Sequence, residues 1–263
     1  MKTTLITGAS GGIGEAFAYK LASRGHNLFL VARSEHKLAA LCTELEQKHQ
    51  IKADYTALDL TERDADERLF AETQKRELEI VWLVNNAGFG NFGDFAESDL
   101  ERELAMVDLN VRVLVALTHH YLKPMRQRKS GVIINVSSTA SFQPVPFMAN
   151  YAATKAFVTS FSEALWEENR KFGVKIIALC PGGTATNFFN EAGVGDKMPL
   201  RALETPESVV ETALRGVEAG NSHIISGWSN YLAAQAGTIV PNSWIARTIG
   251  SVLRPKLKEN KTA

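Results

Sequence analysis

The stretch Thr7-Gly8-Ala9-Ser10-Gly11-Gly12-Ile13-Gly14 decides the fold, because it stands between an apolar strand pattern and an amphipathic helix pattern. Glycines permit a tight turn and let the backbone approach a pyrophosphate, which then rests on the N-terminus of the following helix. We therefore expect a dinucleotide-binding loop here. Its glycine spacing, Gly-x-x-x-Gly-x-Gly, differs from the Gly-x-Gly-x-x-Gly of the usual dinucleotide fingerprint.

Short apolar runs alternate with long amphipathic segments along the chain, which is typical of βαβ units. The predicted strands are Thr3–Thr7, Asn27–Ala32, Ala53–Ala57, Val81–Asn85, Gly131–Ser137, Val174–Leu179 and His223–Ile225. The predicted helices are Gly14–Arg24, Ser34–His49, Thr61–Leu78, Ser98–Arg128, Asn150–Phe172 and Pro206–Ala219. We predict one α/β domain, a doubly wound parallel sheet of about seven strands with helices on both faces, over residues 1–227. Residues 228–263 are predicted to form a C-terminal helical extension of the same domain.

Composition excludes several classes of protein. The 263 residues suit one large domain, and Lys plus Arg equals Asp plus Glu at 29 each, so no overall charge favours nucleic acid. Cys42 and Cys180 are too far apart in sequence to indicate a disulfide framework or a metal motif, and the histidines show no ligand spacing. We therefore expect neither a metal site nor a nucleic-acid partner.

The N-terminal residues lead directly into a strand pattern, without the apolar stretch and cleavage site of a signal peptide. No stretch approaches the ~20 apolar residues of a transmembrane helix. The expected location is the cytoplasm.

A second signal lies in Asn150-Tyr151-Ala152-Ala153-Thr154-Lys155-Ala156. Positions i and i+4 of a helix share a face, so the phenol of Tyr151 and the ammonium of Lys155 lie side by side. An ammonium beside a phenol lowers a pKa that is otherwise near ~10, and such a tyrosine exchanges a proton with a substrate oxygen near neutral pH. Because Tyr-x-x-x-Lys also occurs by chance in amphipathic helices, this interpretation depends on the glycine loop as a second, independent signal.

Together these motifs resemble the short-chain dehydrogenase/reductase family. That family has Thr-Gly-x-x-x-Gly-x-Gly after its first strand and Tyr-x-x-x-Lys with a serine thirteen residues earlier, here Ser138. The resemblance extends from Thr7 to about Thr186 and implies a single-domain Rossmann-type fold. It also implies an oxidoreductase that interconverts a carbonyl and an alcohol by hydride transfer. The rival hypothesis is an NADP(H)-binding sensor without turnover, a class that commonly lacks the catalytic tyrosine or lysine.

The resemblance implies a catalytic set of Asn110, Ser138, Tyr151 and Lys155. Tyr151 exchanges the proton, and Ser138 stabilises the developing charge on the substrate oxygen. Lys155 lowers the Tyr151 pKa and holds the nicotinamide ribose, while Asn110 holds a water that links Lys155 to solvent. Asn110 has an alternative role as a helix-bend asparagine bonded to backbone. The neighbouring Ser137 is expected to contact backbone.

The residue that follows the second predicted strand selects the cofactor. An acidic side chain there would bind a ribose 2′-hydroxyl, whereas Arg33 offers a guanidinium to a 2′-phosphate. We predict NADP(H), with Ser10 and Lys37 as helpers; a solvated Arg33 is the alternative. Asp59 and Leu60 resemble the family's adenine contact. The predicted cofactor contacts are Gly8, Ser10, Gly12, Ile13, Gly14, Arg33, Asp59, Leu60, Asn86, Ala87, Gly88, Tyr151, Lys155, Pro181, Gly182, Thr184 and Thr186.

Residues 187–204 follow the sixth strand, where the family covers its substrate. Phe188, Phe189, Val194 and Met198, with Gly193 and Gly195 among them, predict a flexible lid over a largely apolar ligand. The expected substrate is an apolar ketone, aldehyde or secondary alcohol.

The tail Trp228–Leu257 combines aromatic residues with cations. It is either an interfacial membrane anchor or a pair of short helices that packs over the substrate cleft or a neighbouring subunit, and we favour the second. Family resemblance implies a homodimer or homotetramer built on the predicted helices Ser98–Arg128 and Asn150–Phe172.

Overall fold

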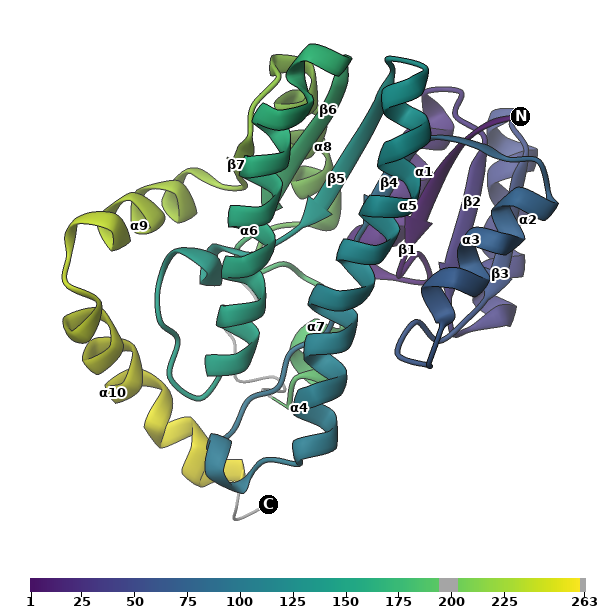
Figure 1. Ribbon diagram of the computed structural model, residues 1–263. Helices are drawn as coiled ribbons and strands as arrows, with labels where there is room; N and C mark the ends of the chain where they lie inside the picture. Colours follow the sequence, from purple (N-terminus) through teal and green to yellow (C-terminus); the bar gives the residue numbers. More distant parts are fainter. Residues whose placement is uncertain (194–202, 261–263) are drawn as a thin grey trace.

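A single parallel sheet organises the structure, a computed structural model that describes residues 1–193 and 203–260, without the side chains of residues 238 and 255–260. Its strand order is β3-β2-β1-β4-β5-β6-β7 (Figure 1). The strands are β1 (Lys2–Thr7), β2 (Leu28–Ala32), β3 (Ala53–Ala57), β4 (Glu79–Asn85), β5 (Gly131–Val136), β6 (Val174–Cys180) and β7 (His223–Ile225). All seven predicted strands are confirmed; β3 and β7 have the predicted bounds, and the ends of the others shift by at most two residues.

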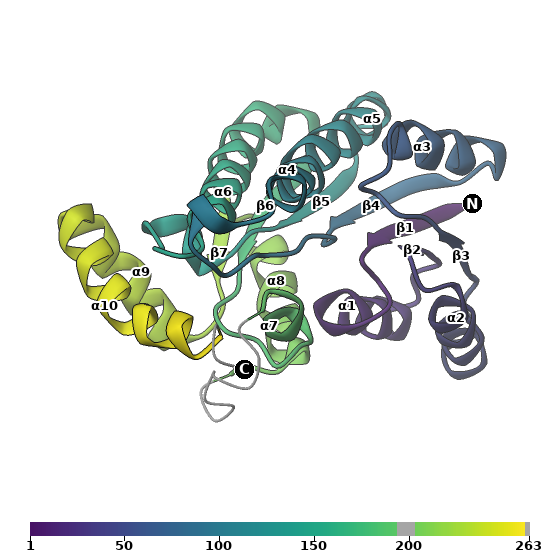
Figure 2. The same ribbon diagram turned by 90° about the horizontal axis from the view of Figure 1, so that it is seen from below.

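Helices cover both faces of the sheet, as predicted (Figure 2). On one face lie α1 (Gly12–Ser23), α2 (Glu35–His49) and α8 (Pro206–Ala219); on the other lie α3 (Ala65–Lys75), α5 (Leu114–Gln127) and α6 (Ala149–Asn169). Successive strand residues point to opposite faces, so Ile6 packs under the first group and its neighbour Leu5 under the second. Burial on both faces explains why β2 and β5 are largely apolar along their whole length rather than alternating.

The helix predicted over Ser98–Arg128 is interrupted. It consists of α4 (Leu100–Val107), a π turn η2 (Asp108–Val113) and α5. In a π turn the hydrogen bonds run from residue i to i+5, and such turns are frequent at functional sites. The turn contains Asn110, so the helix widens where the sequence predicts a catalytic asparagine.

The chain beyond β7 forms two helices, α9 (Trp228–Ile239) and α10 (Asn242–Asn260), separated at Pro241. They extend from the β7 side of the molecule and lie apart from the helices that cover the sheet (Figures 1 and 2). The predicted helical extension is therefore confirmed. Among the helices of residues 1–193 and 203–260, none is long and apolar enough to cross a membrane.

Two asparagines join the central strands inside the core. The Asn85 Nδ2 on β4 donates to Asn135 Oδ1 on β5 at 2.9 Å and to Thr118 Oγ1 on α5 at 3.1 Å. The Asn135 Nδ2 in turn donates to Ser162 Oγ on α6 at 2.9 Å. Because Asn135 and Ser162 are fully buried, these bonds replace the water that their polar groups lose on folding.

We expect Asn135→Ala to lower the free energy of unfolding by about 1–3 kcal/mol, because the buried amide of Asn85 and the buried hydroxyl of Ser162 each lose a hydrogen-bond partner. Denaturant unfolding of the purified protein measures this change. The exposed Asn221, substituted in the same way, is the matched control and should stay within about 0.5 kcal/mol of the parent. Equal stability of the two variants would contradict the role of the asparagine chain.

Candidate active site

The carboxyl ends of β1, β4, β5 and β6 meet at one edge of the sheet. Strand order reverses between β1 and β4, and open α/β sheets bind ligands in the crevice beyond such a point. The segments that leave this edge are the glycine loop, residues 86–88, residues 137–138 and residues 181–186. These segments contain most of the residues that the sequence analysis selects, and α6 brings Tyr151 and Lys155 to the same edge.

The glycine loop leaves no room for side chains at its key positions. Gly8 and Gly12 have positive φ angles of 65° and 57°. A Cβ on Gly14 would lie 2.3 Å from the Gly8 carbonyl oxygen, and one on Gly12 would lie 2.9 Å from Thr186 Cγ2. No side chain caps the N-terminus of α1. The loop therefore presents backbone and a helix N-terminus, which suits the pyrophosphate of a dinucleotide.

Thr7 holds the glycine loop to the end of β4. Its Oγ1 accepts hydrogen bonds from the backbone N–H groups of Asn86 and Ala87, each at 3.0 Å. The Asn86 side chain donates back to the carbonyl oxygens of Thr7 and Gly8 at 2.9 and 3.2 Å. Thr7 belongs to the glycine motif, but its sequence position alone predicts no role for its hydroxyl. A threonine at the carboxyl end of the strand, directly before Gly8, was the available signal.

Residues 181–186 close the site from the β6 side. The Pro181 carbonyl accepts from the Thr139 N–H at 2.9 Å, which ties this loop to the end of β5. Thr184 is buried, and Thr186 contacts Gly12 of the glycine loop across the edge of the sheet. The predicted residues of these two loops thus come together, although they lie far apart in sequence.

A polar cluster that the sequence analysis missed fixes the base of this loop. Glu204 pairs with residues 183–185 through its backbone. Its carboxylate accepts from Ser226 Oγ at 2.9 Å and from Asn230 Nδ2 at 3.2 Å. The Asn230 amide also fills the space where Gly182 lacks a side chain. The first turn of α9 is therefore joined to the loop that borders the site.

Ser138, Tyr151 and Lys155 meet at the carboxyl edge of the sheet, next to Gly88 and Gly90. Tyr151 and Lys155 are only 8% and 5% exposed. The Lys155 Nζ lies 5.8 Å from the Tyr151 ring centroid and donates to the Val136 carbonyl oxygen at 2.8 Å. The expectation for Ser137 is confirmed, because its Oγ donates to the Lys155 carbonyl at 2.8 Å.

The electrostatics of the trio differ from the expectation. Burial raises the pKa of Tyr151 to about 12, and a hydrogen bond with Ser138 acts in the opposite direction. Burial also lowers the pKa of Lys155 to about 8. The net shift of the Tyr151 pKa is upward because desolvation dominates it, and the Lys155 Nζ is bonded to Val136. That Lys155 lowers the Tyr151 pKa stays a prediction. The phenol is protonated at neutral pH.

Asn110 lies in the π turn with its amide fully bonded. Its Nδ2 donates to the Phe89 carbonyl at 3.0 Å and to Thr154 Oγ1 at 3.1 Å, and its Oδ1 accepts from the Phe89 N–H at 3.2 Å. A Cβ on Gly88 would lie 2.8 Å from Asn110 Oδ1 and 3.4 Å from Lys155 Nζ. The structure thus shows the backbone-bonded alternative, next to Lys155, and the water relay stays a prediction.

The predicted adenosine side of the site follows β2 and β3. Arg33 is exposed at the end of β2, and the Ala9 N–H bonds the Val31 carbonyl at 3.2 Å, which brings the glycine loop to the same strand end. The Asp59 carboxylate accepts from the backbone N–H and the hydroxyl of Thr61 at 2.9 and 2.8 Å. The Leu60 side chain is buried in the core, so only its backbone remains for a cofactor contact.

An apolar wall stands beside the phenol. The Phe188 ring centroid lies 5.3 Å from that of Tyr151. Phe188 belongs to a cluster formed by Phe92, Phe147, Met148, Phe188, Phe189, Ala192 and Leu253. Two residues of the predicted lid, Phe188 and Phe189, are therefore part of this wall, whereas Val194 and Met198 lie outside the described residues.

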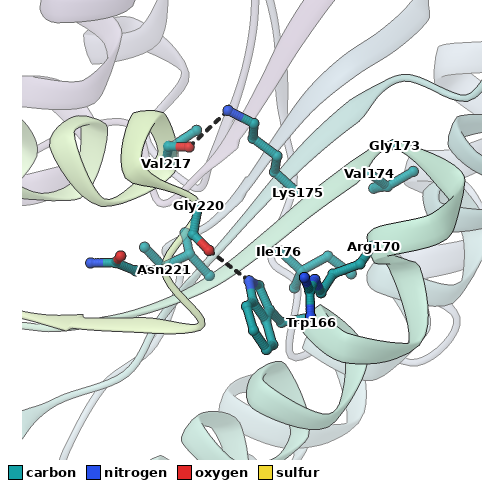
Figure 3. Close-up of a pocket in the computed structure, with 10 residues that line it drawn as sticks. Trp166, Arg170, Gly173, Val174, Lys175, Ile176, Val217, Gly220 and Asn221 are labelled. Carbon is teal, nitrogen blue, oxygen red and sulfur yellow. Dashed lines mark hydrogen bonds between the residues drawn. The ribbon is translucent and has the colours of Figure 1, made fainter.

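A cavity of about 320 Å³ lies at the other end of β6 (Figure 3). It exists because β7 pairs only with Ala178–Cys180 and leaves the start of β6 uncovered. The Trp166 Nε1 and Lys175 Nζ at its wall donate to the carbonyl oxygens of Gly220 and Val217, at 2.8 and 3.0 Å. Since Tyr151 lies at the opposite edge of the sheet, this cavity is separate from the candidate active site.

Comparison with known proteins agrees with this geometry. A very-long-chain 3-oxoacyl-CoA reductase of Laccaria bicolor is 37% identical over 174 residues, which cover 65% of this chain and 52% of that protein, so the chain spans about half of its length. A 7beta-hydroxysteroid dehydrogenase of Mediterraneibacter gnavus is 31% identical over 229 residues, with 86% of each chain covered.

Among solved structures, a short-chain dehydrogenase from Sphingobium yanoikuyae in complex with NADPH matches with a TM-score of 0.81 and 30% identity. The match covers 91% of this chain and 95% of that one. The family model described as "short chain dehydrogenase" matches residues 2–196. The chain therefore belongs to the short-chain dehydrogenase/reductase family.

Proposed function

We propose that the protein is an NADP(H)-dependent oxidoreductase that interconverts a carbonyl group and an alcohol, with Tyr151 as the acid/base. The observation that carries this proposal is the meeting of Ser138, Tyr151 and Lys155 at the carboxyl edge of a sheet whose switch point carries a glycine loop. Related proteins named as reductases and dehydrogenases support the same reaction class.

The residues present fit a dinucleotide. Gly8, Gly12 and Gly14 let the loop pack tightly against Asn86, Ala87 and Thr186 with no side chain of its own at these positions, and the N-terminus of α1 follows without a side-chain cap. Arg33 supports NADP(H) over NAD(H), because a guanidinium matches a 2′-phosphate, and the related Sphingobium structure contains NADPH. When bound, the cofactor supplies or accepts the hydride, while the chain supplies orientation and charge.

Proton transfer is the part of the reaction that this chain performs. For carbonyl reduction Tyr151 must start protonated, which its raised pKa ensures at neutral pH. Its proton passes to the substrate oxygen as charge develops there, and Ser138 stabilises that charge with a hydrogen bond. The phenolate left behind is stabilised by Lys155, which is a cation below a pH of about 8.

The substrate is an apolar carbonyl compound or the corresponding alcohol. The support is the wall that Phe188, Phe147 and Leu253 help to form beside Tyr151. Relatives are named for very-long-chain 3-oxoacyl-CoA and 7beta-hydroxysteroid substrates, whose acyl chain and steroid skeleton are large apolar groups, which agrees with such a wall.

We also propose that the protein is located in the cytoplasm and forms a homodimer or homotetramer. The observation that supports an oligomer is a set of exposed apolar side chains on the two helices predicted to form the subunit interface. Leu104 and Val107 on α4 and Phe157 on α6 are 50%, 38% and 42% exposed. These residues offer a surface for a second subunit.

Tyr151→Phe should lower carbonyl reduction by roughly 10² to 10⁴, because no other group replaces the positioned acid. NADPH binding, followed by fluorescence, should persist. Tyr55→Phe on β3 is the matched control and should keep parent activity. Parent-like turnover of Tyr151→Phe would refute the scheme, and NADPH binding without turnover of any apolar carbonyl compound would favour the sensor hypothesis.

Carbonyl reduction should decline as the pH rises through about 8, because Lys155 then loses its charge and no longer stabilises the phenolate. We expect Lys155→Met to be slower by roughly 10² at neutral pH and to lack this alkaline decline. Steady-state rates across the neutral and alkaline range measure both effects. Lys175→Met, at the other end of β6, should retain the parent profile; an unchanged alkaline decline in Lys155→Met would disprove the assignment.

Arg33→Asp should shift preference from NADPH toward NADH. Loss of a charge-assisted hydrogen bond and its replacement by a like charge should raise the KM for NADPH at least ~10-fold. The ratio of NADPH-dependent to NADH-dependent turnover measures the shift, and Arg170→Asp, at the amino end of β6, is the control. An unchanged ratio in Arg33→Asp would show that Arg33 is a solvated loop residue that does not select the cofactor.

A further inference from the structure

The helices α9 and α10 are here called the C-terminal arm (residues 228–260). The outer surface of this arm is unusually apolar. Large exposed hydrophobic side chains on it are Trp228, Tyr231, Leu232, Ile239, Val240, Trp244 and Val252. Four of these residues share one face of α9, because Tyr231, Leu232 and Ile239 follow Trp228 by three, four and eleven residues. Trp228 and Ile239 are 75% and 84% exposed, so this face has no partner among the described residues.

The opposite face of α9 packs against the body of the protein. Ala234 is buried in a small cluster with Cys180 at the end of β6 and Ile225 on β7. A Cβ on Gly237 would lie 3.2 Å from the Phe142 carbonyl oxygen. The small residues of α9 therefore set its distance from the body and turn its aromatic face outward.

The inner face of α10 packs against the same part of the body. A Cβ on Gly250 would lie 3.6 Å from Pro146, and Leu253 joins the apolar wall with Phe147 and Phe188. Trp244 and Val252 point the other way, with 66% and 60% exposure. The inner faces of α9 and α10 therefore pack against the body, whereas packing over a substrate cleft stays a prediction, and the outer faces need another explanation.

Charge is divided between the arm and the body. Residues 228–260 contain four Lys and Arg and one acidic residue, whereas residues 1–227 contain 24 basic and 28 acidic residues. On α10, Arg247 follows Trp244 by three residues and lies on the same exposed side. Exposed tryptophans with a neighbouring arginine, next to a body that has four more acidic than basic residues, match an anionic and apolar partner.

We propose that the outer faces of α9 and α10 bind the surface of an anionic lipid bilayer. Tryptophan and tyrosine suit the boundary between headgroups and acyl chains, and flanking cations are attracted to anionic lipid. A second copy of the chain is the weaker occupant, because Leu104, Val107 and Phe157 offer apolar surface elsewhere for subunit contact. Since Leu253 lines the apolar wall beside Tyr151, the arm brings the cleft close to a source of apolar substrates.

Sedimentation with vesicles tests this proposal on the full chain. The vesicles consist of phosphatidylcholine alone or of an equimolar mixture with phosphatidylserine. We expect the parent to bind the mixed vesicles more strongly, with less binding at high salt. The double variant Trp228→Ser/Trp244→Ser should lower the bound-to-free ratio at least ~10-fold. Arg247→Gln should lower it by about fivefold on the mixed vesicles only.

Phe95→Ser is the matched control, since Phe95 is 61% exposed but lies outside the arm, and its binding should equal that of the parent. Unchanged thermal melting and NADPH binding show that each variant folds. Light scattering should give the same oligomer for all variants. Parent protein that stays in the supernatant, parent-like vesicle binding of the double tryptophan variant, or an arm variant that changes the oligomer would each overturn the proposal.

Discussion

Close backbone packing at the end of β1 is the constraint on which the rest of the structure depends. Gly14 lies so near Gly8 that a Cβ would come within 2.3 Å of its carbonyl oxygen, and the Asn86 amide occupies the remaining space. This packing joins β1, the start of α1 and the end of β4 at the point where strand order reverses. The crevice left beside it accepts backbone contacts from a dinucleotide, and α6 places Tyr151 at its border.

Desolvation then gives the site its chemical character. Burial raises the pKa of Tyr151 to about 12 and lowers that of Lys155 to about 8, so the two groups move apart from nearly equal ordinary values, each toward its neutral form. A phenol held in its protonated form and an ammonium close to losing its proton suit an exchange of protons with a substrate oxygen. The aromatic wall beside Tyr151 explains both the desolvation and the expected preference for apolar substrates.

The positions of the strands along the chain are predictable from sequence, because strands buried in the sheet are mostly apolar and the motif residues follow their ends. The interruption of the long helix at Asn110 is not predictable, since a π turn hardly alters the apolar periodicity and depends on contacts with Phe89. The pKa of Tyr151 depends on burial that no local pattern reveals. The contacts of Glu204 with Ser226 and Asn230 likewise join residues that no motif connects.

The most direct test of the account is transfer of deuterium from NADPH that is deuterated on its nicotinamide ring. The parent enzyme would be incubated with bulky apolar ketones, steroid ketones and 3-oxoacyl thioesters, and the products analysed by mass spectrometry. The account predicts deuterium on the carbinol carbon of an alcohol product, in an amount equal to the NADPH consumed. Tight NADPH binding with no deuterium in any product would contradict it.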